Sequence, residues 1–197
     1  MTIALALVAA YLVGSIDFAM IVSRMQGVDI REVGSGNPGA SNVLRTLGRF
    51  PAAMVLVGDL LKGVIAAAMG LVASGTGDPQ VHWAFAAGLA AVVGHCYPLF
   101  HRFRGGKGMA TALGALAFTV PFAALVGGVL WLLTVWVTKT ASLASMLVVV
   151  AAVPLALWQG VRGWALLWLA AMVVLVVWRH RGNIVRMVRG SEQKVPT

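Results

Sequence analysis

The sequence predicts an all-α polytopic membrane protein with about seven transmembrane helices in a single domain, residues 1–197. Three observations support this fold class. Hydrophobic residues make up 60% of the chain, whereas soluble domains are about 45–50% apolar. Charged residues fall to 11%, against about 25% in soluble domains. Apolar runs close to the roughly 20 residues that cross a bilayer recur along the chain.

The elements follow in chain order. Apolar runs that could each form one spanning helix are 2–23, 51–74, 81–100, 143–158 and 163–178. The first run has no basic n-region and no clear small-residue cleavage site, so we expect a retained helix and not a signal peptide. The run 109–138 is long for one span and short for two. Pro121 and the pair Gly127-Gly128 offer places to break it.

Loop charges favour two short helices in 109–138. The stretches 24–49, 101–107 and 179–194 are basic, whereas the connection 74–82 has no Lys or Arg. Basic loops collect on the cytoplasmic side. A helix pair keeps Lys139 and the basic tail on that side, which predicts seven helices with the N-terminus outside and the C-terminus inside. A count of five or six helices is the alternative. The net charge of +9 then indicates membrane orientation and does not require nucleic acid.

The first polar interruption is rich in glycine and small polar side chains. It reads Gly34-Ser35-Gly36-Asn37-Pro38-Gly39-Ala40-Ser41-Asn42 and is followed by Arg45. The G-x-G-x-x-G spacing is not a dinucleotide fingerprint, because a membrane helix and not a strand precedes it. We expect Ser41 or Asn42 to cap a short helix that carries Arg45, which would form an anion site. The alternative is an ordinary turn-rich loop.

The second interruption runs from Gly94-His95 to Gly105-Gly106-Lys107-Gly108. It fails the Walker A pattern, because His101 stands at the first glycine position and Gly108 follows Lys107 where Ser or Thr is needed. Glycines beside a lysine at a helix start still favour phosphate. For Arg102 and Arg104 the alternative is simple anchoring at the membrane surface.

Other polar residues fall at helix ends or within spans. Asp59 and Lys62 share a helix face, which favours a structural ion pair over substrate contact. His180 and Asn183 share a face of the basic tail, whose alternative role is binding anionic lipid. Ser142 lies at a helix start, where it could be a plain N-cap. The single cysteine, Cys96, excludes an internal disulfide. We expect no metal site and no cofactor.

These motifs together resemble a known family. The two glycine-rich segments, the stretch Asp59-Leu60-Leu61-Lys62-Gly63, the turn at Ser142 and the run His180-Arg181-Gly182-Asn183 occur in the order found in bacterial acylphosphate-dependent glycerol-3-phosphate acyltransferases of the PlsY type. Gly182 departs from the family, where Glu is common. The resemblance implies an inner-membrane enzyme with its site facing the cytoplasm. It implies acyl transfer from acyl phosphate to the 1-hydroxyl of glycerol 3-phosphate, giving lysophosphatidic acid and phosphate. A soluble partner of the PlsX type would supply the acyl phosphate.

Two anionic substrates require fixed cations, for which Arg45 and Lys107 are the best candidates. We expect catalytic roles for Ser35, Lys107, His180 and Asn183. The predicted substrate-binding residues are Gly34, Gly36, Asn37, Gly39, Ser41, Asn42, Arg45, His95, Gly105, Gly106, Gly108 and Ser142. Either His180 or the acyl phosphate could take the hydroxyl proton. The resemblance implies the substrate-assisted route, which we prefer. The alternative function is a membrane transporter for a small organic phosphate, which the absence of an internal repeat disfavours.

Overall fold

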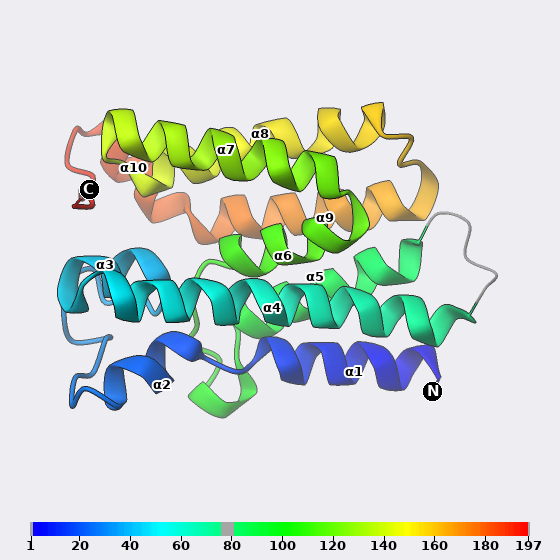
Figure 1. The fold of residues 1–197 in the computed structure, drawn as a ribbon, viewed down its shortest axis with the longest axis horizontal. Coiled ribbons are helices and arrows are strands. Elements are labelled where there is room, and N and C mark those ends of the chain that lie inside the picture. Colours follow the sequence, from blue (N-terminus) through cyan, green and yellow to red (C-terminus); the bar gives the residue numbers. More distant parts are fainter. Residues whose placement is uncertain (1, 76–80, 197) are drawn as a thin grey trace.

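The computed structural model describes residues 2–75 and 81–196 as a bundle of helices, and these ranges contain no strand (Figure 1). The predicted outer connection at 74–82 lies largely outside them. The α-helices of the described residues are α1 (Ile3–Gly14), α2 (Phe18–Arg24), α3 (Ala40–Leu47), α4 (Arg49–Ser74), α5 (His82–Cys96), α6 (Met109–Thr119), α7 (Pro121–Thr138), α8 (Ala141–Trp158), α9 (Gly163–Arg179) and α10 (Arg181–Val188), and the 3-10 turn η2 covers Leu99–His101.

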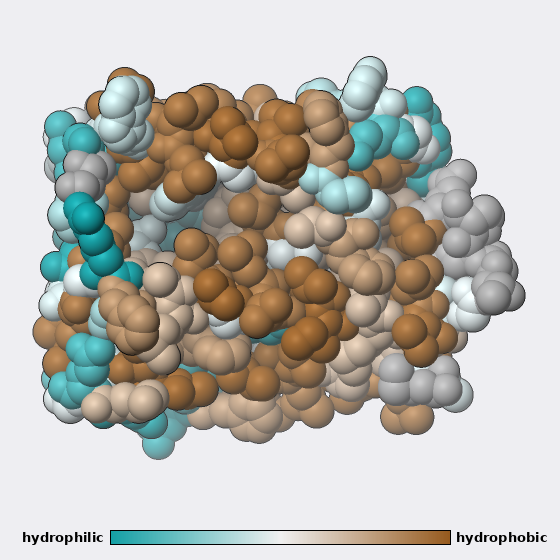
Figure 2. Space-filling model, in the orientation of Figure 1, coloured by the Kyte–Doolittle hydropathy of each residue, from teal (hydrophilic) through white to brown (hydrophobic). Residues whose placement is uncertain are grey.

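The membrane-spanning character of the chain is evident in the described helices. Five segments are long and apolar enough to cross a bilayer: Ile3–Arg24, Arg49–Ser74, His82–His101, Pro121–Thr138 and Ala141–Trp158. A sixth would be α9 together with α10, which are bent by 55° at His180. On the face shown in Figure 2, apolar surface covers the middle, and polar surface gathers along the left edge and at the upper right. The count of seven and the sidedness of the termini stay predictions.

The run 109–138 forms two helices, as expected. The chain breaks at Val120, and Pro121 begins α7, where a missing N–H costs nothing. Helix α6 has 11 residues, about 16 Å at 1.5 Å per residue, which is short of the ~30 Å hydrocarbon core. It lies inside the bundle, against α4, α5 and α7.

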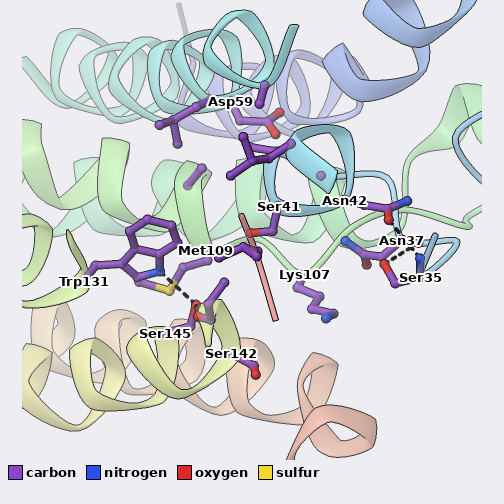
Figure 3. A pocket seen from close by; sticks show the side chains of 18 of the residues that line it. Ser35, Asn37, Ser41, Asn42, Asp59, Lys107, Met109, Trp131, Ser142 and Ser145 are labelled. Carbon is purple, nitrogen blue, oxygen red and sulfur yellow. Dashed lines mark hydrogen bonds between the residues drawn. The ribbon is translucent and has the colours of Figure 1, made fainter. Parts of the chain in front are cut away.

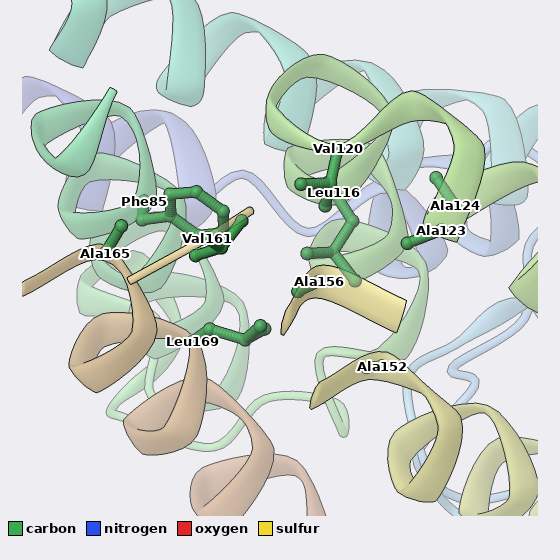
Figure 4. Close-up of a cluster of buried hydrophobic side chains, with 10 residues drawn as sticks. All are labelled: Phe85, Leu116, Val120, Ala123, Ala124, Ala152, Ala156, Val161, Ala165 and Leu169. Carbon is green, nitrogen blue, oxygen red and sulfur yellow. The ribbon is translucent and has the colours of Figure 1, made fainter. Parts of the chain in front are cut away.

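Small residues let the helix backbones approach closely. A side chain on Gly114 of α6 would collide with the Leu60 carbonyl of α4, and one on Gly63 of α4 would collide with the Thr111 carbonyl. Such contacts are typical of helix packing in membranes. A cluster of buried apolar side chains, among them Phe85, Leu116 and Leu169, joins α5 through α9 (Figure 4). The bundle therefore forms a rigid frame behind the polar loops.

Both glycine-rich loops and the tail belong to the half of the bundle that carries α3, α10 and the C-terminus. The N-terminus lies at the opposite end (Figure 1). Helices α1 and α2 form one interrupted segment, and Asp17 caps α2 by accepting a hydrogen bond from the Met20 N–H at 3.0 Å. The same carboxylate lies 3.8 Å from Arg31, so Asp17 pairs with an arginine.

Candidate active site

The 34–42 loop folds around the buried side chain of Asn42. Its Oδ1 accepts a hydrogen bond from the Ser35 N–H at 2.8 Å, and its Nδ2 donates to the carbonyls of Ile30 and Val33 at 3.1 and 3.0 Å. Gly34 has a φ of +60° and sits so close to Asn42 that a side chain there would collide with the amide oxygen. Asn42 therefore builds the loop, with both amide hydrogens engaged.

The short helix that carries Arg45 is present as α3, but its predicted cap is wrong. Gly39 occupies the N-cap position, while Ser41 and Asn42 lie within the first turn. The Gly39 carbonyl accepts the first backbone bonds, from Asn42 and Val43. Asn42 is not the cap because its side chain is engaged with the preceding loop. The hydroxyl of Ser41 is left at the cavity described below.

The 105–108 loop packs directly against the first loop. The Gly106 N–H donates to the His95 carbonyl at 3.1 Å, and a side chain on Gly106 would meet the His95 ring and the Pro38 carbonyl. The Arg179 guanidinium donates to the carbonyls of Gly105 and Gly106 at 2.7 and 3.0 Å. Gly106 therefore lets the two loops meet, and Arg179 holds the second loop in place.

A buried charged group lies beneath the loops. The Lys62 ammonium is 2.7 Å from the Asp59 carboxylate and donates to the Ile16 carbonyl at 2.9 Å. The His95 Nδ1 lies 3.5 Å from the same carboxylate. The predicted structural ion pair of Asp59 and Lys62 is confirmed, and His95 links it to Gly106.

The polar segments converge on one cavity of about 510 Å³. Of the predicted site residues, those that line it are Ser35, Asn37, Gly39, Ser41, Asn42, Arg45, His95, Lys107, Gly108, Ser142, His180 and Asn183. Gly34, Gly36, Gly105 and Gly106 do not line it and instead shape the loops. Ser142 is not an N-cap either, since Thr140 occupies the N-cap position of α8.

The cavity has a polar and an apolar region. Lys107, Ser35 and Asn37 lie at one end, while Trp131 and Met109 lie toward the other (Figure 3). The apolar wall continues with Leu56, Leu60, Leu113 and Leu132. The Trp131 indole N–H donates to the Ser145 hydroxyl at 3.3 Å, so its polar atom is satisfied. The cavity can therefore hold a molecule with an anionic head and an apolar tail.

Positive charge is concentrated at the polar end. The pKa of Lys107 is lowered to about 8, chiefly by burial; Glu192 opposes this shift, and the guanidinium groups of Arg186, Arg45 and Arg179 contribute to it. Like charges held together in a partly buried site are stabilised when an anion arrives. This cluster is therefore suited to bind phosphate.

His180 is buried at the bend between α9 and α10. The pKa of His180 is lowered to about 4, chiefly by burial and also by Lys107, while the hydrogen bond to Val176 opposes the shift. The ring is therefore neutral at pH 7. Its Nδ1 lies 2.8 Å from the Val176 carbonyl, which fixes the hydrogen on Nδ1 and leaves Nε2 as an acceptor.

Arg186 and Glu192 are among the polar residues that line the cavity and that the motifs missed. Glu192 accepts hydrogen bonds from the Ser142 hydroxyl at 3.0 Å, the Asn183 amide at 2.6 Å and the Arg186 Nε at 2.9 Å. The available signal was that Glu192 is the single acidic residue after position 78. An isolated carboxylate in a basic tail indicates a specific partner.

Comparison with known proteins gives one consistent result. The family model for glycerol-3-phosphate acyltransferase matches residues 4–190. A glycerol-3-phosphate acyltransferase of Pseudomonas syringae pv. tomato is 45% identical over 190 residues, 93% of each chain. One of Pseudomonas fluorescens is 45% identical over 187 residues, covering 94% of this chain and 96% of its own.

Two solved structures share the whole fold. Both are of PlsY, an integral membrane glycerol 3-phosphate acyltransferase. Its glycerol 3-phosphate form matches with a TM-score of 0.91 at 38% identity, and its lysophosphatidic acid form with 0.89 at 37%. Each match covers 99% of this chain and 96% of the other.

Proposed function

This chain belongs to the glycerol-3-phosphate acyltransferase family, and from that premise we propose that it transfers a fatty acyl group from acyl phosphate to the 1-hydroxyl of glycerol 3-phosphate. The products are lysophosphatidic acid and phosphate. The observation that carries the proposal is a single cavity that joins a cation cluster to an apolar wall. The solved relatives in glycerol 3-phosphate and lysophosphatidic acid forms support the acceptor and the product.

The cation cluster binds the two phosphates. Arg45 and Lys107 provide the charge, and Arg186 adds a third cation at the same cavity. Guanidinium and ammonium groups both bind phosphate strongly where water is excluded. The side chains of Ser35, Asn37 and Ser41 line the same cavity and orient phosphate or glycerol oxygens.

The apolar wall takes the fatty acyl chain. It is built from α4, α6 and α7, with Leu56, Leu60, Met109 and Leu132 as typical members. Relative to water, burial of each chain methylene contributes about 0.8 kcal/mol. The chain then lies beside lipid while the reacting carbonyl lies at the polar end, next to the lysine.

The reaction proceeds by direct attack. The hydroxyl oxygen of glycerol 3-phosphate bonds to the acyl carbon, the bond from that carbon to the phosphate oxygen breaks, and the hydroxyl proton passes to the departing phosphate. His180 is a weak base because its pKa is about 4. It orients the hydroxyl through Nε2, and the amide of Asn183, which Glu192 holds at 2.6 Å, lies at the same cavity.

Backbone N–H groups stabilise the tetrahedral oxyanion. The Gly106 N–H is engaged with His95, so we place this role at the start of α6, where Gly108, Met109 and Ala110 line the cavity. One such donor typically contributes ~3–4 kcal/mol to catalysis. Acyl phosphate is already activated, so no covalent enzyme intermediate is needed.

The cellular setting follows from the same proposal. The enzyme resides in the bacterial inner membrane with its cavity open to the cytoplasm, where glycerol 3-phosphate is available. A soluble enzyme of the PlsX type supplies acyl phosphate, and membrane lipid surrounds the spans. No nucleic acid takes part.

A phosphate-release assay tests the function. Purified protein in lipid mesophase receives acyl phosphate with or without glycerol 3-phosphate, and both phosphate and lysophosphatidic acid are measured. We expect equal amounts of the two products, formed only when both substrates are present. A transporter would release no phosphate in this single compartment, and that result would refute the proposal.

A further inference from the structure

The C-terminal segment 192–195, here called the strap, crosses the candidate site although no motif marks it. Its backbone contacts Arg45 of α3, which is about 150 residues away in the sequence. We infer that the strap is a positioning element that aims the Arg45 guanidinium at the substrate phosphate. This inference rests on the proposed function, because it takes Arg45 to be a phosphate ligand.

The contacts hold one edge of the guanidinium and leave another open. Arg45 Nε donates to the Lys194 carbonyl at 2.8 Å, and Nη2 donates to the Gln193 carbonyl at 3.0 Å. A guanidinium presents five N–H groups in a rigid plane. The edge formed by Nη1 and the second hydrogen of Nη2 remains available for bidentate contact with phosphate. The two carbonyls therefore fix the plane of the group and carry no charge that would neutralise it.

The strap is fastened on both sides of these carbonyls. Before them, the Glu192 carboxylate accepts hydrogen bonds from Ser142, Asn183 and Arg186. After them, the Val195 N–H donates to the Lys139 carbonyl at 2.8 Å, and the Val195 side chain is only 4% exposed. Two anchors, one on α8 and α10 and one at the α7–α8 turn, hold the carbonyls in register with Arg45.

The opposite role would be a competitor that occupies the phosphate site. A carboxylate would then take the edge of Arg45 that substrate needs, but Arg45 meets neutral carbonyls and Glu192 bonds to other side chains. The two roles predict opposite changes in the KM for glycerol 3-phosphate. Detaching a positioning strap raises the KM for glycerol 3-phosphate, whereas detaching a competitor lowers it.

The test detaches the strap by changing its backbone. Val195→Pro removes the N–H that bonds to Lys139, and insertion of two glycines between Glu192 and Gln193 shifts the carbonyls away from Arg45. We expect each change to raise the KM for glycerol 3-phosphate about tenfold, equivalent to about 1.4 kcal/mol, with little change in kcat. Lys194→Ala is the matched control, because it keeps the backbone carbonyl that Arg45 bonds and its side chain does not line the cavity, so it should retain the wild-type KM.

The decisive comparison repeats the strap substitution in the Arg45→Ala protein. If the strap acts through Arg45, Val195→Pro should raise KM no further in the Arg45→Ala protein. An unchanged or lowered KM in both strap variants, or an equal rise in the Arg45→Ala background, would overturn the inference. Wild-type protein without phosphate release would instead refute the proposed function, so the two failures are distinguishable. Thermal melting of each variant identifies any that fails to fold, and the glycine insertion keeps the test open if Val195→Pro does.

Discussion

Lys107 shows how a single residue acquires its properties from the site around it. Its ammonium lies at the cavity end among Arg45, Arg179 and Arg186, and burial with these charges lowers its pKa to about 8. The free enzyme therefore loses this charge as the pH rises through about 8, while bound phosphate restores it. The glycines on either side of Lys107 indicated a phosphate loop, but the arginines that surround it come from distant helices.

The pH dependence of kcat/KM for glycerol 3-phosphate follows from this. It reports the ionisation of the free enzyme, so we expect it to fall as the pH rises above about 8. Lys107→Arg stays charged throughout this range and should not show the fall. Lys107→Ala should lower kcat/KM by an amount equivalent to a loss of ~2–5 kcal/mol in transition-state stabilisation. An alkaline limb that persists in Lys107→Arg would show that another group is responsible.

At the scale of elements, close packing of α4 and α6 sets the position of the 105–108 loop. The Gly114 backbone contacts the carbonyl of Leu60, with no room for a side chain. Gly114→Val should therefore force the helices apart and destabilise the protein by about 1–3 kcal/mol. The measurement is the melting temperature in detergent.

Gly128→Val on α7 is the control for this substitution. An added side chain at Gly128 meets no heavy atom within 4 Å, so its melting temperature should remain close to wild type. Similar melting temperatures for the two valine variants would contradict the proposed role of the α4–α6 contact.

The sequence predicted the type of most elements but not their ends. Of the two predicted break points in 109–138, Pro121 begins α7, because proline is favoured in the first turn of a helix, whereas Gly127-Gly128 lie within α7. The predicted N-cap of α3 was wrong. Local preference favoured Ser41 or Asn42, but the Asn42 amide donates to the carbonyls of Ile30 and Val33 and Gly39 takes the N-cap position. Local propensity could not anticipate that contact, which depends on how the preceding loop folds.

At the scale of the whole molecule, the cavity is assembled from segments spread over the entire chain. The motifs identified Ser35, Lys107 and Asn183, and the fold brings them to one cavity. Glu192 and the strap were missed because their importance lies in contacts with residues far away in the sequence. Motif chemistry was enough to select Ser35, Lys107 and Asn183 as candidates. Glu192 and the strap could be recognised only from the three-dimensional structure.

The central claim is that both substrates occupy this cavity together and react directly. Initial rates measured over a grid of acyl phosphate and glycerol 3-phosphate concentrations test it, because an enzyme-bound acyl intermediate gives ping-pong kinetics. The account predicts intersecting double-reciprocal lines. Parallel lines, with a burst of phosphate before glycerol 3-phosphate is added, would contradict it.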